Sequence, residues 1–201
     1  MKRLFDVFCS SVGFFFLSPL LISIGASIKI SDGGPVFFVQ ERMGRNFRPF
    51  KLYKFRTMVM DAQKKGLAIT AADDPRITRV GGFLRRSKLD ELPQLINVIN
   101  GDMSLVGPRP EVQKYVQLFE KEYREILTVR PGLTDYAALE FIDEEAILGS
   151  YDDREAAYVE EVLPRKIELY HKYLVNQGLG TDVSIILKTL FRSFRSSRGN
   201  S

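Results

Sequence analysis

The feature that most constrains the fold is the apolar stretch from Leu4 to Ile28, in a chain of 201 residues. Asp6 is the one charged residue among these 25 positions. As a helix, the stretch would be about 38 Å long, which is enough to cross the hydrocarbon core of a bilayer. A run this long, without an A-x-A-like site at its end, is not typical of a cleaved signal peptide. We therefore expect a membrane helix, followed by a single domain.

Ser18 and Pro19 interrupt this stretch near its middle. A proline inside a helix removes one hydrogen bond and clashes with the preceding turn, so we expect a kink at Pro19. The flanking charges do not decide the topology, because Lys2 and Arg3 precede the stretch and Lys29 follows it. The residues alone leave two arrangements open, a kinked spanning helix and a helix that returns to the side it entered.

Charge distribution and rare residue types exclude several function classes. The sequence pI is about 9.1. Residues 1–60 carry nine Lys/Arg against three Asp/Glu and residues 171–201 carry five against one, whereas residues 111–170 carry seven against fifteen. A basic excess beside the apolar segments fits anionic lipid better than nucleic acid. The lone Cys9 excludes a disulfide framework, and the lone His171 argues against histidine-based zinc sites and serine or cysteine hydrolase machinery.

A second informative segment runs from Leu84 to Pro110. Ser87 followed by Asp90 three positions later has the spacing of a capping box, which predicts a helix from Lys88 to a C-cap at Gly101. Asp90 would then lie in the first turn, where the positive end of the helix dipole favours an ionised carboxylate at neutral pH. By spacing alone, capping is the commoner explanation for this acid.

Two features of the same segment go beyond capping. A cap needs one acid, and Glu91 supplies a second carboxylate beside Asp90. Arginines also lie on both sides of the pair, with Arg85 upstream and Arg109 held between two prolines downstream. Clustered arginines of this kind are suited to an anionic phosphate substrate.

Motifs spread over most of the chain resemble, in the same order, those of the bacterial sugar transferases, a family of monotopic phosphoglycosyl transferases. The matching pieces are Lys2–Asp6, Ser18-Pro19, Gln40–Arg42 with Gly44, Tyr53–Met58, Leu89–Leu95, Gly101–Ser104, Gly107–Pro110 and Arg130–Gly132. The resemblance implies transfer of a sugar-1-phosphate from a UDP-sugar to polyprenyl (undecaprenyl) phosphate, with release of UMP. In that family this is the first membrane step of cell-envelope glycan or glycoconjugate assembly.

The resemblance also implies roles for individual residues. Asp90 would be the nucleophile that forms a covalent aspartyl-phosphosugar intermediate, and Glu91 would bind Mg²⁺. The candidate phosphate-binding residues are Lys54, Arg56, Arg85, Arg109 and Arg42. The Ser18-Pro19 break would make the helix re-entrant, with the catalytic domain on the cytoplasmic face of the bacterial inner membrane. Capping by Asp90 would then be a second role for this residue.

The expected fold is an α/β mixture, mostly α with a small sheet, forming a single catalytic domain. We expect a re-entrant membrane helix over residues 1–30, a cytoplasmic catalytic domain over 31–182, and an amphipathic interfacial helix with a disordered tail over 183–201. Strand candidates are Val36–Gln40, Phe50–Met60 and Met103–Val106. Lys54 and Arg56 share a face of the second strand, which a solvated surface would explain about as well as a phosphate site.

The rest of the chain is expected to be helical, apart from a polar, mobile loop over residues 61–79. Pro110 suits the first position of a helix that continues to Leu127, and Asp152 suits the cap of helices interrupted at Pro164. Val183–Arg195 predicts a basic amphipathic helix, which would lie at a lipid interface or pack on the core. Leu133–Glu140 departs from the Gly-x-Ala-Gln-Val-Asn-Gly-Arg run of many family members, so nucleotide-sugar contacts do not transfer to this loop.

Two function classes compete with the transferase. One is a membrane-anchored scaffold in which Asp90 and Glu91 only cap a turn, and the other is a hydrolase of nucleotide sugars that uses water as the final acceptor. The sequence leaves open the sugar, the glycan, the prenyl chain length and the oligomeric state, a homo-oligomer included.

Overall fold

The computed structural model describes residues 1–62, 74–141 and 144–199, with side chains described for all of these except 145 and 193–199. Its main elements are α1 (Lys2–Asp32), β1 (Phe37–Met43), β2 (Pro49–Phe55), α2 (Arg79–Arg86), η3 (Leu89–Glu91), α3 (Gln94–Asn100), β3 (Ser104–Val106), α4 (Gln113–Leu118), α5 (Glu120–Ile126), β4 (Gly132–Thr134), α6 (Tyr136–Glu140), α7 (Glu144–Gly149), α8 (Arg154–Ala157), η4 (Tyr158–Val162), α9 (Leu163–Val175) and α10 (Leu179–Gly199). A short 3₁₀ turn, η1 (Arg45–Phe47), joins the first two strands.

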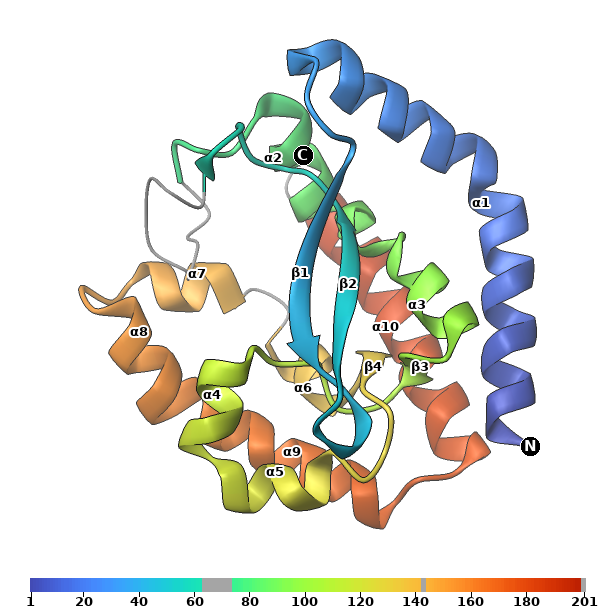
Figure 1. The fold of residues 1–201 in the computed structure, drawn as a ribbon, viewed down its shortest axis with the longest axis vertical. Coiled ribbons are helices and arrows are strands. Elements are labelled where there is room, and N and C mark those ends of the chain that lie inside the picture. Colours follow the sequence, from blue (N-terminus) through green and yellow to red (C-terminus); the bar gives the residue numbers. More distant parts are fainter. Residues whose placement is uncertain (63–73, 142–143, 200–201) are drawn as a thin grey trace.

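The prediction of a mostly helical fold with little sheet is confirmed. β1 and β2 form an antiparallel hairpin in which Phe37 pairs with Phe55 and Phe38 with Lys54, and β3 pairs with β4 in parallel. Figure 1 shows the hairpin at the centre, α1 along the right side and top, and α4, α5, α8 and α9 below and to the left. The largest apolar cluster lies among these last helices and includes Tyr123, Leu163 and Tyr170.

Helix α1 is long and apolar enough, by length and composition, to cross a membrane. It ends at Gly33, whose φ of 71° is the left-handed conformation common at helix C-termini. Pro19 lies inside the helix, and the Ser18 hydroxyl donates to the Phe15 carbonyl at 2.7 Å. Figure 1 shows a bend between the lower and upper parts of α1, as expected for a helix interrupted by proline.

The N-terminal end of α1 is bonded to the domain that follows it. Lys2 Nζ donates to the buried Asp182 carboxylate at 2.5 Å and to the Val106 carbonyl at 3.1 Å. The buried Asp6 carboxylate accepts from the Ser104 hydroxyl at 2.9 Å. Arg3 donates to the carbonyls of Val98 and Ile99, at the end of α3.

The C-terminal end of α1 is bonded to the same domain. Asp32 forms an ion pair with Arg56, which lies directly after β2. Between the two ends, α1 packs against α3, and its Ile24 and Ile28 form an apolar cluster with Phe55 and Leu84. Both ends of the bent helix are therefore held by one body.

The predicted helix from Lys88 to Asn100 is wrong in its first half. Ser87 is the C-cap of α2, and its hydroxyl donates back to the Phe83 carbonyl at 2.8 Å. Lys88 has a φ of 56°, and only the 3₁₀ turn η3 precedes α3. The physical reason is Pro93, which has no N–H group to donate to the Leu89 carbonyl; this carbonyl accepts from the Leu92 N–H at 3.3 Å instead, as in a 3₁₀ turn. Gly101 does end α3, with a φ of 97°, as predicted.

Several other predicted boundaries need correction. The helix after Pro110 begins later, with Val112 as the N-cap of α4, and it is divided at Phe119, whose backbone is not helical. The cap of α8 is Asp153 rather than Asp152. Strand β2 stops at Phe55 because the chain then turns, pairing Met58 with Ile77 in an isolated bridge. Of the predicted loop over 61–79, residues 63–73 lie outside the described part.

The C-terminal helix α10 packs on the domain through one face and leaves another uncovered. Ile185 is buried with Val106, Leu139 and Tyr173. Leu187 and Leu190 on the same helix are exposed. The predicted amphipathic character is therefore present, but the expected disordered tail is wrong at its start, because α10 continues through Gly199.

Candidate active site

Asp90 lies in the turn η3, between α2 and α3, and its side chain is largely buried. Among the described residues, none donates a hydrogen bond to its carboxylate, and neither η3 nor α3 has a side-chain cap. The predicted capping role of Asp90 is therefore wrong. A carboxylate that satisfies no backbone N–H group has both oxygens available to a substrate.

The neighbouring Glu91 is the centre of a charged cluster. Its Oε1 accepts from Lys54 Nζ at 2.8 Å and also from Arg109 Nη2, while its Oε2 accepts from Arg109 Nη1 at 3.3 Å. We call Lys54, Glu91 and Arg109 the Glu91 cluster. It brings together residues from β2, from η3 and from the segment after β3, at the turn that carries Asp90.

Close backbone packing fixes the position of Arg109. A Cβ atom built on Gly132 would lie only 2.1 Å from the Gly107 nitrogen, so this crossing of the chain requires glycine. The Arg109 N–H then donates to the buried Asp135 carboxylate at 3.0 Å. Asp135 also caps α6 by accepting from the Ala138 N–H at 2.5 Å. Besides the two flanking prolines, Asp135 therefore helps to hold the backbone of Arg109 in place.

The two adjacent carboxyl groups have opposite pKa shifts. Burial, and then the negative charge of Glu91, raise the pKa of Asp90 from 3.8 to about 6, although Lys54, Arg85 and Lys88 oppose this. Burial would also raise the pKa of Glu91, but the charges of Arg109 and Lys54 outweigh it and hold that pKa well below its usual range. The shift in the Asp90 pKa is upward, yet a pKa near 6 still leaves Asp90 mostly ionised at pH 7, the state expected from the sequence.

Of the remaining candidate residues, one lies near Asp90 and two lie outside the Glu91 cluster. Arg85 lies close enough to Asp90 for its charge to lower the pKa of that carboxyl. Arg42 instead bonds to Gln40 and to the buried Glu111, at the far end of the hairpin from Lys54. Arg56 is paired with Asp32 at the end of α1. In this structure Arg42 and Arg56 therefore have structural partners of their own and lie outside the Glu91 cluster.

Sequence reasoning missed Asp135 and Glu111. Asp135 had a detectable signal, because an aspartate ahead of Tyr136–Glu140 is a plausible helix cap. It lies in the loop that departs from the family pattern, so the resemblance did not mark it. Glu111 accepts from the Tyr158 hydroxyl at 2.6 Å and pairs with Arg42 at 3.4 Å. The residues around Glu111 in the sequence do not predict these contacts.

Comparison with known proteins agrees with the motifs. Residues 1–196 match the sequence model of the bacterial sugar transferase family. The chain is 36% identical over 195 residues to the UDP-N-acetylgalactosamine-undecaprenyl-phosphate N-acetylgalactosaminephosphotransferase of Aeromonas hydrophila, covering 94% of this chain and 43% of that protein. It is 35% identical over 198 residues to the UDP-glucose:undecaprenyl-phosphate glucose-1-phosphate transferase of Escherichia coli K12, covering 96% of this chain and 40% of that protein.

A shorter relative is covered more fully. The putative undecaprenyl-phosphate N-acetylgalactosaminyl 1-phosphate transferase of Bacillus subtilis strain 168 is 43% identical over 122 residues, which are 61% of this chain and 68% of that protein. The chain thus spans less than half the length of the two longer relatives and about two thirds of this one. Because the family model covers nearly the whole sequence, the chain belongs to the bacterial sugar transferase family.

Proposed function

We propose that this protein transfers a sugar-1-phosphate from a UDP-sugar to undecaprenyl phosphate, releasing UMP, as a step in polysaccharide assembly. The observation that carries the proposal is the Asp90 carboxylate, buried and without a hydrogen-bond donor among the described residues, beside the cations of the Glu91 cluster. Family membership and the names of the three relatives support the same activity. Those names carry different sugars, so the donor is proposed only as a UDP-sugar.

In the proposed mechanism, an Asp90 oxygen attacks the β-phosphorus of the UDP-sugar. The bond from this phosphorus to the bridging oxygen breaks, and UMP leaves with that oxygen. The phosphate of undecaprenyl phosphate then attacks the same phosphorus, which breaks the acyl phosphate bond and restores the Asp90 carboxylate. Both nucleophiles are already anionic, so neither step needs a base to remove a proton.

Positioning and charge neutralisation must supply the rate, since phosphoryl transfer demands little else of the protein. Lys54 and Arg109 are the phosphate-binding residues best placed to do this, and Arg85 lies near enough to assist. In this structure both cations of the cluster are bonded to Glu91. Substrate phosphates would therefore compete with Glu91 for Lys54 and Arg109.

The carboxylates present are chemically suited to Mg²⁺, a hard cation that usually takes one or two carboxylates together with phosphate and water. In the described part of the chain no group of three or more His, Cys, Asp or Glu side chains is arranged to hold a metal, so substrate phosphates would have to complete the ligand set. We propose Glu91 as the protein ligand. Bound Mg²⁺ would supply positive charge to the phosphate oxygens.

We further propose that α1 is re-entrant and that the domain faces the cytoplasm. Lys2 and Asp6 at one end and Asp32 at the other bond to the same body, 26 or more residues apart in α1. If the helix spanned a bilayer, these two ends would lie on opposite sides of it. The bend at Pro19 and the exposed apolar side chains between the ends, among them Phe15 and Phe16, support a helix that enters one leaflet and returns.

Incubation with a UDP-sugar labelled in the sugar, with and without undecaprenyl phosphate, tests this function. We expect label in the organic-extractable lipid together with one UMP per labelled lipid. Release of free sugar phosphate without labelled lipid would instead identify a hydrolase. Absence of both, across the common UDP-sugars, would favour a non-catalytic scaffold.

A further inference from the structure

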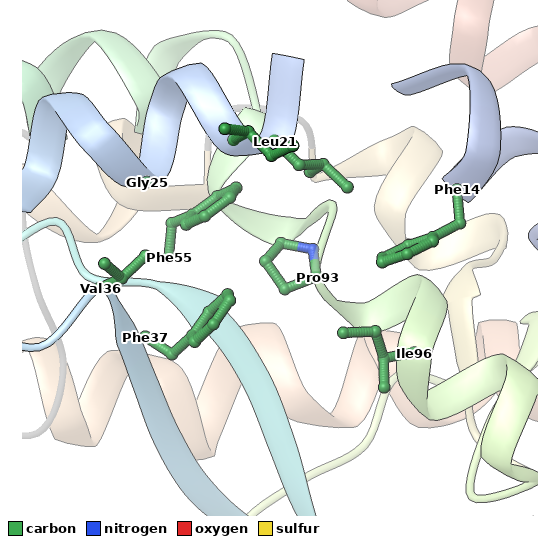
Figure 2. Close-up of a pocket in the computed structure, with 9 residues that line it drawn as sticks. Phe14, Leu21, Gly25, Val36, Phe37, Phe55, Pro93 and Ile96 are labelled. Atoms are coloured by element: carbon green, nitrogen blue, oxygen red, sulfur yellow. The ribbon is translucent and has the colours of Figure 1, made fainter. Parts of the chain in front are cut away.

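An apolar pocket of about 270 Å³ lies between α1, the hairpin and the start of α3. It is lined by Phe14, Leu21, Ile22, Gly25, Val36, Phe37, Phe55, Pro93 and Ile96. Figure 2 shows the side chains of Phe14, Leu21, Phe37, Phe55 and Ile96 around one region, with the Pro93 ring between the Phe37 and Phe55 rings on one side and Phe14 and Ile96 on the other. None of the lining residues is charged, so the pocket offers nothing to bind a nucleotide or a sugar.

The walls of the pocket are well defined. Phe37 and Phe55 stack across the hairpin with their ring centroids 5.6 Å apart and their planes at 16°. On the opposite wall, a Cβ atom on Gly25 would lie 3.3 Å from Val36 Cγ1, so the absence of a side chain at Gly25 lets α1 approach the hairpin closely. Ile22 and Gly25 come from α1, the helix that we propose enters the membrane, so this wall would face lipid.

Residues that line the pocket are close in sequence to residues of the candidate active site. Phe55 directly follows Lys54, and Phe37 is the strand partner of Phe55. Pro93 is two residues after Glu91, and Lys54 Nζ lies 2.8 Å from Glu91 Oε1. The strand β2, which carries Phe55 and Lys54, is in contact with the turn η3, which carries Asp90 and Glu91, so the pocket and the Glu91 cluster are built on the same two segments. A ligand that fills both regions has a phosphate at one end and a hydrocarbon chain at the other.

We infer that this pocket binds the isoprene units of undecaprenyl phosphate nearest to its phosphate. The inference rests on the proposed function and adds to it a binding site for the acceptor. Its volume suits only the first part of a long prenyl chain, so the rest would lie along α1 in the lipid. The water-soluble donor has no apolar portion for this site, so the pocket serves the acceptor alone.

Kinetics with pocket-filling variants test this assignment. Ile22 and Ile30 are both exposed isoleucines of α1, 72% and 84% exposed, but only Ile22 lines the pocket. We expect Ile22→Trp and Ile96→Trp to raise the KM for undecaprenyl phosphate about tenfold or more, the effect of losing burial of roughly two methylene groups. UMP release from the UDP-sugar alone should be unchanged in these variants, which also shows that they fold. Ile30→Trp should change neither quantity. An unaltered KM in both pocket variants would overturn the assignment.

A binding measurement makes the test independent of turnover. The chain contains no tryptophan, so Phe37→Trp introduces a single fluorophore in the pocket wall and Ile30→Trp one outside it. Each is placed in nanodiscs of phosphatidylcholine with brominated acyl chains, which quench tryptophan on contact. Undecaprenyl phosphate should relieve the quenching of Phe37→Trp and not that of Ile30→Trp, also when Asp90→Asn is added.

The outcomes separate the two proposals. Relief of quenching without any catalytic product would support the pocket and count against the proposed function. Persistent quenching of Phe37→Trp in a preparation that makes labelled lipid would show that membrane acyl chains fill the pocket, and it would overturn the inference while leaving the function intact.

Discussion

Replacing Asp90 by asparagine should stabilise the protein while abolishing turnover. The side chain keeps its shape, and no described residue donates a hydrogen bond that would be lost. The pKa raised from 3.8 to about 6 means that folding disfavours the ionised form by at most about 3 kcal/mol, at about 1.4 kcal/mol per pKa unit. An amide avoids this cost. For a chain of this size, we expect the melting temperature to rise by about 5–10 °C at most.

The pH dependence fixes the sign of this effect. The native state binds the Asp90 proton more tightly than the unfolded state, so the wild type loses stability as pH rises from about 4 to about 6, and the penalty is complete above pH 6. The advantage of Asp90→Asn should therefore be full at pH 7.5 and disappear near pH 4. Thermal unfolding in one detergent at pH 7.5, 5 and 4 measures it, with the exposed Asp152→Asn as the control. Equal or lower stability of Asp90→Asn at pH 7.5, or an advantage that does not vary with pH, would refute the reasoning.

Three further predictions concern rate, metal and topology. The kcat/KM for UMP release should fall about tenfold per pH unit below pH 6, because protonated Asp90 is a poor nucleophile. A kcat/KM that stays constant down to pH 4.5 would exclude Asp90 as the titrating group. Glu91→Gln should lower kcat/KM about 100-fold at fixed Mg²⁺ and raise the Mg²⁺ concentration needed for half-maximal activity, because the amide loses the charge that attracts the ion. Full activity of the wild type in excess chelator would contradict the metal role of Glu91. For the topology, a cysteine is added before Met1 or in place of Ser31 in a Cys9→Ser background. Both cysteines should react with an impermeant maleimide in inside-out vesicles and not in right-side-out ones. Labelling of the two cysteines from opposite sides would establish a spanning helix.

How far the sequence predicted this structure depended on whether the determining forces are local. The apolar run, the bend at Pro19 and the glycine cap at Gly101 follow from local sequence, and all three are present. The turn around Asp90 was predicted wrongly because Pro93 was not weighed against the capping pattern of Ser87. A proline constrains the backbone more strongly than a cap stabilises it, by roughly 3 kcal/mol against about 1.

Ion-pair partners were harder to predict than elements. Lys54 and Arg56 alternate along the same segment, yet Lys54 pairs with Glu91 and Arg56 with Asp32. Packing between distant segments determines which carboxylate pairs with each cation, so the sequence around the cation does not identify its partner. The same applies to Lys2 and Asp182, which lie 180 positions apart. The resemblance supplied Asp90, Glu91 and Arg109 because it carries such long-range information.

The most direct test of the covalent mechanism is intact-protein mass spectrometry after mixing the enzyme with UDP-sugar alone. If Asp90 is the nucleophile, up to one UMP per active site should be released before any undecaprenyl phosphate is present. The protein should gain the mass of one sugar phosphate, and Asp90→Asn should gain none. Adding undecaprenyl phosphate should then remove the adduct and yield the labelled lipid. If UMP appears only when the lipid is added and no adduct forms, transfer is direct and Asp90 is not the nucleophile.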